Sequence, residues 1–382
     1  MKKLVLFALL VSISIGAMAQ KGKANSAIRL TKEGQLIRAK ADLDLALAHR
    51  KSANLPITFF AKAQLAQAAF EYENTTLFAD PLDEAYAAFE KAMQLDQTKK
   101  EQIKRKIISG SMYNALADCF YYQGGEQYEV EDFVGALKSF ETQIKIVNSD
   151  MYVGDIDTGM YYNAGIAALN AEMFDVALKY FNICADMKYM GIVPHYQIYE
   201  THVAKGDIAA AEAVLKSLPS LFPNDKSITL QLIDLYIKSG KHDEALQYLA
   251  MAKQDDPTNS IFYFVAGIIN LEAENYDEAI VELRRSIELD PDMFDAQYGL
   301  GAAYINKAAR MFREANDIMD VSQYNAAVDA ANEVYANALP NMEKALQLNP
   351  DDVYTMQNLK ELYYRMGLTE KYDAITAKLD GR

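Results

Sequence analysis

A regular series of alanines constrains the fold of this chain more than any other feature of its 382 residues. From Ala177 to Ala279, three successive intervals are each 34 residues long, and looser intervals extend the series in both directions. The series consists of Ala39, Ala85, Ala136, Ala177, Ala211, Ala245, Ala279 and Ala338. Four residues after each of these comes a large apolar residue, namely Leu43, Phe89, Phe140, Phe181, Leu215, Leu249, Leu283 and Met342. A fixed period of this length predicts a repeat array, in which each repeat is too small to bury its own apolar face.

The pattern inside one period is typical of two helices packed against each other. Apolar residues three or four positions apart share one face of a helix and form its buried stripe. Alanine suits the point where the second helix crosses the first, because a larger side chain would push the helix axes apart. Gly206 and Gly240 are expected to end first helices in the left-handed conformation that glycine adopts most easily.

Residues 260–293 show this pattern most clearly, with Tyr263, Gly267, Ala279, Leu283 and Pro291 at fixed offsets. The pattern resembles the tetratricopeptide repeat. The resemblance implies an all-α fold, a right-handed α-solenoid of helix-turn-helix repeats, and a function in binding other proteins. The tryptophan usual at the first aromatic position of that family occurs nowhere in this chain.

Aligned on the alanines, the chain divides into eight repeats and a closing cap. The third repeat contains about seven extra residues, which we place around Gly124 and Gly125. In the eighth repeat 25 residues are inserted before Ala338, and we expect the segment 306–336 to lengthen both helices into a projecting hairpin with a break near Asp320. The predicted repeats are 20–53, 56–100, 110–150, 158–191, 192–225, 226–259, 260–293 and 294–352, followed by the cap 353–382.

The first 19 residues have the pattern of a secretory signal peptide. Lys2 and Lys3 supply its positive start, an apolar core ends at Ile15, and residues 17–19 form a small-x-small cleavage site. This apolar run is shorter than the ~18–20 residues of a membrane-spanning helix, and no other stretch approaches that length. We expect cleavage near Ala19, no transmembrane segment, and export to the periplasm or the medium. Together with the repeats, this arrangement resembles exported tetratricopeptide proteins of the Bacteroidetes type.

The chain is acidic, which argues against nucleic acid and anionic membranes as partners. Its formal net charge is −15, and loss of Lys2 and Lys3 with the signal peptide would leave −17, with 36 basic against 53 acidic residues. The one basic cluster lies between Lys99 and Lys106 and is interleaved with Glu101. We interpret it as a solvated helix face.

No pattern of residues indicates catalysis, a metal or a cofactor. His195 and His202 are seven residues apart, but both occupy packing positions of their repeat. Cys184 takes a small buried position that is alanine in other repeats, so we interpret Cys119 and Cys184 as small core residues, with a disulfide between them as the alternative. We expect no enzyme, no metal site and no cofactor.

The register also predicts which residues line a groove. The resemblance implies that first helices form the concave face of the array and that particular offsets point into it. At those offsets the chain is apolar and rich in tyrosine, with a few acids. The alternative is that the superhelix or the inserted hairpin buries these side chains internally. The predicted groove residues are Tyr162, Ile166, Tyr196, Glu200, Leu230, Asp234, Phe264, Ile268, Tyr298 and Ile305.

These observations lead to one main functional hypothesis and two alternatives. The main hypothesis is an exported, non-catalytic scaffold that binds a peptide or a helical segment of another protein in its groove. The first alternative is a self-associating structural subunit of an envelope complex, a homo-oligomer held together through the 306–336 insertion. The second is a glycan-binding module or an enzyme built on carboxylates and tyrosines that no motif singles out.

Overall fold

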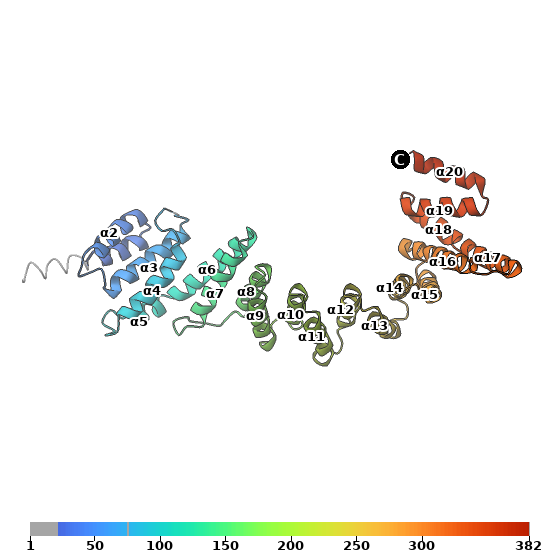
Figure 1. Ribbon diagram of the computed structural model, residues 1–382. Coiled ribbons are helices and arrows are strands. Elements are labelled where there is room, and N and C mark those ends of the chain that lie inside the picture. Colours follow the sequence, from blue (N-terminus) through green and yellow to red (C-terminus); the bar gives the residue numbers. More distant parts are fainter. Residues whose placement is uncertain (1–21, 75, 382) are drawn as a thin grey trace, which may run out of the picture. The chain divides into compact units, whose positions relative to one another are not determined.

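The computed structural model describes residues 22–74 and 76–381, and every regular element within them is an α-helix (Figure 1). The expected all-α fold is confirmed. The chain forms two compact units, divided between Val214 and Leu215. None of the helices among these residues has a stretch that is both long enough and apolar enough to cross a membrane. The predicted signal peptide, residues 1–19, lies outside the described residues.

The N-terminal unit begins with a helix at residues 22–32. It continues with α2 (Leu36–Ala48), α3 (Pro56–Glu71), α4 (Pro81–Leu95), α5 (Ile103–Ser109), α6 (Met112–Glu129), α7 (Phe133–Val147), α8 (Gly159–Asn170), α9 (Phe174–Asp186) and α10 (Val193–Ala204). The division between the units falls within α11 (Ile208–Leu221). The C-terminal unit contains α12 (Ser227–Lys238), α13 (His242–Asp255), α14 (Ser260–Glu272), α15 (Tyr276–Leu289), α16 (Phe294–Ala315), α17 (Val321–Ala336), α18 (Leu339–Leu348), α19 (Val353–Arg365) and α20 (Thr369–Asp380).

Consecutive helices pack as pairs, and we call the two members of each pair the first and the second helix. The pairs include α3 with α4, α6 with α7, α8 with α9, α12 with α13 and α14 with α15. All eight alanines of the series have no exposed surface at all. The apolar residues that follow them by four positions are at most 4 % exposed. The series therefore marks the buried seam of each pair.

A glycine of the first helix faces the apolar residue of the second helix across this seam. A Cβ built on Gly165 would lie 2.6 Å from the ring of Phe181, and one built on Gly124 would lie 2.6 Å from the ring of Phe140. No real Cβ approaches another atom that closely, so the two helices can cross at this distance only with glycine. Gly124 thus occupies the same position in its pair as Gly165 does.

This position corrects the prediction of extra residues around Gly124 and Gly125. α6 is one continuous helix of 18 residues that passes through both glycines. Gly124 precedes Ala136 by 12 residues, as Gly165 precedes Ala177, so nothing is inserted between them. The helix is instead longer on its N-terminal side.

Several first helices end in a left-handed residue. Gly206 and Gly240 have φ angles of 79° and 69°, as their place after α10 and α12 predicted. Glu131, Glu172 and Glu274 hold the equivalent places after α6, α8 and α14, with φ angles of 63°, 57° and 60°. A side chain in this conformation is strained, and no pattern in the sequence distinguishes these glutamates from others.

The insertion before Ala338 is helical. α16 has 22 residues, α17 has 16, and the two pack against each other as a hairpin (Figure 1). The connecting residues end at Asp320, close to the predicted break, and the Asp320 side chain accepts a hydrogen bond from the backbone of Gln323. The expected lengthening of both helices is wrong for the second one, because α17 ends at Ala336 and α18 starts anew at Leu339. Pro340 in the first turn of α18 fits a fresh helix start.

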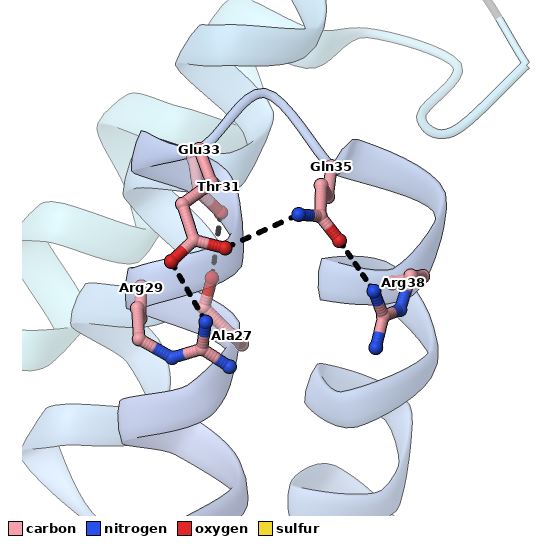
Figure 2. A network of polar contacts seen from close by, with 6 residues as sticks. All are labelled: Ala27, Arg29, Thr31, Glu33, Gln35 and Arg38. Atoms are coloured by element: carbon pink, nitrogen blue, oxygen red, sulfur yellow. Dashed lines mark hydrogen bonds and ion pairs between the residues drawn. The ribbon is translucent and has the colours of Figure 1, made fainter.

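The first turn of the array is fixed by a short polar network (Figure 2). The carboxylate of Glu33 accepts hydrogen bonds from Arg29, at 2.7 Å, and from Gln35, at 3.2 Å. The side-chain carbonyl of Gln35 in turn accepts a hydrogen bond from Arg38 at 2.6 Å. These groups are exposed and contribute little stability individually. They link the helix at 22–32 to α2 across the turn between them.

We expect Ala177→Leu to lower the free energy of unfolding by about 1–3 kcal/mol, because the seam between α8 and α9 has no room for a larger side chain. Ala209→Leu, at an exposed position of α11, is the matched control and should change it by less than about 0.5 kcal/mol. Urea denaturation followed by far-ultraviolet circular dichroism measures both variants. Equal, small effects would contradict a close helix crossing at the alanines.

Candidate functional site

Two hollows open between consecutive first helices of the N-terminal unit. The α3–α6 hollow has a volume of about 840 Å³, and the α6–α8 hollow has a volume of about 330 Å³. The α3–α6 hollow is lined by Ala69, Phe70, Glu71, Glu73, Asn74, Phe78, Ala79, Pro81, Ala115, Asp118, Cys119, Tyr122 and Glu126. The α6–α8 hollow is lined by Tyr121, Gly125, Tyr128, Glu129, Phe140, Tyr162, Asn163 and Ile166.

α6 supplies one wall of both hollows, and helix geometry explains how. Asp118, Tyr122 and Glu126 are four residues apart and therefore form one stripe along the helix, which faces α3. Tyr121 and Gly125 lie one position earlier, about 100° around the helix axis, and face α8. A single helix can thus present different side chains to the hollows on its two sides.

Large aromatic side chains remain open to solvent here. Tyr122 is 65 % exposed and Tyr121 is 46 % exposed, and their rings meet edge to face with centroids 5.5 Å apart. Tyr128 is held more firmly, because its ring contacts Phe133 at 5.2 Å and its hydroxyl accepts a hydrogen bond from Asn170. Exposed aromatic groups in a hollow are typical of surfaces that bind a partner.

Tyr162 and Ile166, both predicted as groove residues, lie in the α6–α8 hollow. Tyr162 is half-buried, with its ring 5.8 Å from that of Phe181 and 5.9 Å from that of Tyr189. Burial raises the pKa of the Tyr162 hydroxyl, so it stays protonated and can donate or accept a hydrogen bond. The structure therefore brings these two predicted residues together with Tyr121 and Tyr128 of α6.

The charge of the α3–α6 hollow is negative. Four carboxylates line it, from Glu71, Glu73, Asp118 and Glu126, and none of the described residues in its lining is a lysine, an arginine or a histidine. Glu71 is oriented by Gln67, which donates a hydrogen bond to it at 2.9 Å. The hollow can therefore attract cations and repel anions.

Cys119 lies in the wall of the hollow, and the pKa of its thiol reflects these negative surroundings. Burial raises the pKa of its thiol to about 12, and the negative charges of Glu71 and Asp118 add to the rise. Cys119 and Cys184 are both buried and free, which agrees with their interpretation as small core residues. Burial also raises the pKa of the Cys184 thiol, to about 11.

The other two predicted groove residues of this unit lie on α10. Tyr196 is half-buried, whereas Glu200 is exposed. Their neighbour His195 is also half-buried, and burial lowers the pKa of its imidazole while the charge of Asp186 opposes that shift. A partly buried, neutral histidine matches the predicted packing role.

The predicted groove residues of the C-terminal unit have two different surroundings. Leu230 is 47 % exposed and lines a small hollow of about 180 Å³ with Phe262 and Asp255. Asp234 lies one turn further along α12 and forms an ion pair with Lys238 at 2.8 Å.

The remaining four are partly buried. Phe264, Ile268, Tyr298 and Ile305 lie on α14 and α16, which contact each other, and they pack against the apolar core of the unit. Tyr298 also accepts a hydrogen bond from Asn358 of α19 at 3.3 Å. For these residues, packing between first helices takes up much of the surface that the groove prediction assigned to a partner.

The basic cluster at residues 99–106 lies only partly on a helix, so the prediction of one helix face was wrong. Lys99 and Lys100 precede α5, and left-handed φ angles of 55° at Lys99 and 51° at Gln102 interrupt the helix. A mostly apolar hollow of about 620 Å³ opens beside them. Lys104 at its rim forms an ion pair with Asp150.

The residues of the α3–α6 hollow escaped sequence reasoning. The predicted groove residues begin at Tyr162, in the part of the chain where the 34-residue period is unbroken. A usable signal did exist, because Asp118, Tyr122 and Glu126 recur every four residues on the exposed side of α6. The α3 residues that line the hollow, Ala69, Phe70 and Glu71, do not show this four-residue spacing.

Comparison with known proteins gives the repeats their family. Residues 202–263 match the family model described as Tetratricopeptide repeat, and residues 267–307 match the one described as TPR repeat. The chain contains tetratricopeptide repeats. Superkiller complex protein 3 of Mus musculus is 21 % identical in an alignment 297 residues long. The match covers 73 % of this chain and 18 % of that protein, so this chain spans less than a fifth of its relative.

Two solved structures are similar to this chain at low identity. MamA from Desulfovibrio magneticus RS-1, residues 41 to the end, is 18 % identical with a TM-score of 0.37 and covers 51 % of this chain and 97 % of its own. YrrB, described as a TPR protein with an unusual peptide-binding site, is 21 % identical with a TM-score of 0.35 and covers 50 % of this chain and 95 % of its own.

The protonated state of Cys119 gives a pH-dependent prediction. In a Cys184→Ala variant, the native protein should react with iodoacetamide at pH 8 about a thousandfold more slowly than the unfolded protein, because its thiol pKa is about 12 instead of 9.0. Between about pH 8 and 10 the native rate should keep rising, whereas the unfolded rate should level off near the ordinary thiol pKa. Mass spectrometry measures the labelled fraction. Rapid native labelling at pH 8 would contradict a buried thiol in a negative environment.

Proposed function

We propose that this tetratricopeptide-repeat protein is a non-catalytic scaffold that binds a segment of another protein along its first helices. The observation that carries the proposal is the pair of hollows flanking α6, which leave Tyr121 and Tyr122 exposed between them. Tyrosine combines a large apolar surface with a polar tip and loses little conformational entropy on binding, so it is common among residues that dominate binding energy.

An extended segment or an amphipathic helix would suit this surface. The hollows lie on the two sides of α6, so one ligand crossing α3, α6 and α8 could occupy both. Tyr162 and Ile166 would then contact it in the α6–α8 hollow. Tyr196, Glu200, Leu230 and the other predicted groove residues remain part of the proposal as contacts further along the chain.

Site-specific photocrosslinking tests the proposal. Benzoylphenylalanine in place of Tyr122 or Tyr162 should crosslink to a discrete protein in an envelope extract of the source cells, because both positions border the hollows. The matched control is Val134, which is 62 % exposed on α7, the second helix of the same pair. Crosslinking from Val134 to the same protein, or none from Tyr122 and Tyr162, would contradict binding along the first helices.

The mass of the crosslinked product separates this function from self-association. The tip of the α16–α17 hairpin is the feature that favours a homo-oligomer, since Met319 is 99 % exposed and Val321 is 72 % exposed. A product of twice the mass of the chain would indicate a second copy in the hollows. A product of another mass would indicate a different protein.

We further propose that the chain is exported. The support is the signal-peptide pattern of residues 1–19, with its positive start, short apolar core and small-x-small end. Expression of the full chain in a Gram-negative host should give a periplasmic protein whose amino-terminal sequencing starts at Gln20. A chain that keeps Lys2 and Lys3 and stays in the cytoplasm would contradict export.

A further inference from the structure

The four carboxylates of the α3–α6 hollow lack the counter-ions that neighbouring carboxylates have. On α4, Glu84 forms an ion pair with Lys62 at 2.7 Å, and Asp83 forms one with Lys138. Among the residues that the structure describes, no ion pair involves Glu71, Glu73, Asp118 or Glu126.

A basic group beside the lining is already engaged. Lys40 lies 5.7 Å from the centre of the Phe78 ring, which forms part of the lining, but its ammonium group pairs with Asp44 at 2.8 Å. The hollow thus gathers negative charge around an open volume of about 840 Å³ without neutralising it from within the described chain. Bringing like charges together is unfavourable, and a bound cation would relieve it.

Aromatic groups line the same volume. Phe70, Phe78 and Tyr122 contribute rings to the hollow, next to the carboxylates. A guanidinium or ammonium group is attracted to the face of an aromatic ring, and arginine stacks on it especially well. Carboxylates beside aromatic rings therefore favour a cationic side chain over both an anionic and a purely apolar one.

We propose that the α3–α6 hollow receives arginine or lysine side chains of a basic protein segment, so that the partner of this acidic chain is basic where it crosses α6. The inference rests on the proposed scaffold function and specifies the chemistry of its partner. Each exposed ion pair contributes little affinity. The carboxylates together select the partner by charge and accelerate its approach.

The stripe on α6 suggests how the cations are spaced. Asp118 and Glu126 are eight residues apart in one helix, which is about 12 Å along its axis. An extended peptide covers that distance in roughly four residues. A segment that runs along this stripe before it crosses to α8 could therefore reach both carboxylates with two arginines four positions apart.

Fluorescence anisotropy with synthetic peptides tests the proposal. The probes are fluorescein-labelled peptides of about twelve residues, long enough when extended to cross three helices. They carry two arginines four positions apart among leucine and tyrosine. The matched probes replace both arginines by citrulline, which keeps the shape and removes the charge. We expect the arginine peptides to bind about tenfold more tightly at low salt and to lose that advantage at high salt.

Two variants of equal charge change locate the effect. Asp118→Lys with Glu126→Lys should abolish the preference for arginine, whereas Asp155→Lys with Asp186→Lys, at exposed positions outside the hollow, should keep it. The neutral pair Asp118→Asn with Glu126→Gln should reduce the preference without reversing it. Circular dichroism confirms that each variant is folded.

The outcomes separate this inference from the proposed function. Equal binding of arginine and citrulline peptides that crosslink at Tyr122 would overturn the basic preference and leave the scaffold function standing. Retention of the preference by the Asp118→Lys, Glu126→Lys variant would also overturn it, because the cations would then bind elsewhere. If the arginine peptides bind but crosslink at Val134 and not at Tyr122, both proposals fail.

Discussion

The close crossing of the two helices in each pair is the constraint on which the rest of the structure depends. A repeat of two helices cannot bury its own apolar face, so it is stable only when its helices pack tightly and its neighbours cover it. Alanine on the second helix and, in several pairs, glycine on the first make that crossing possible. Gly124 and Gly165 show how strict it is, since even one methyl group would overlap the facing ring.

The candidate site follows from what this seam leaves free on α6. Gly124 holds α6 against Phe140 of α7, so other faces of the helix point toward the neighbouring first helices. They present Asp118, Tyr122 and Glu126 to α3 and Tyr121 to α8. The two hollows thus form on either side of α6 without disturbing the pairing that stabilises the array.

The sequence predicted the features that follow from the repeat period. It did not predict where individual helices begin or how long they are. The alanines predicted the buried seams, and Gly206 and Gly240 predicted left-handed helix ends, because only one type of residue satisfies these geometries well. The extra residues around Gly124 were misplaced because they lie on the N-terminal side of α6 instead. Here the tight crossing requires Gly124 inside a helix. The new helix start at Leu339 was missed, since the alanine-rich sequence before it favours a continuous helix.

The site was predictable only in part, for a related reason. Tyr162 and Ile166 came from the register and do border a hollow, while Phe264, Ile268, Tyr298 and Ile305 came from the same register and are partly buried. A register gives the direction of a side chain on its own helix. Whether a neighbouring helix then covers that side chain depends on helix lengths and crossing angles, which a sequence does not state. The charge of the α3–α6 hollow depends on two helices meeting, and neither helix alone reveals it.

The left-handed glutamates after α6, α8 and α14 carry a consequence for how the array opens. Each keeps a side chain where α10 and α12 are followed by glycine, and that conformation costs on the order of 1 kcal/mol. In an array held together by nearest-neighbour contacts, such costs stay local and are not averaged over the molecule. Hydrogen exchange would accordingly be uneven from pair to pair, with amides near Glu131, Glu172 and Glu274 exchanging sooner than those near Gly206 and Gly240. The surface around α6 would then lie next to a segment of lower local stability, at Glu131.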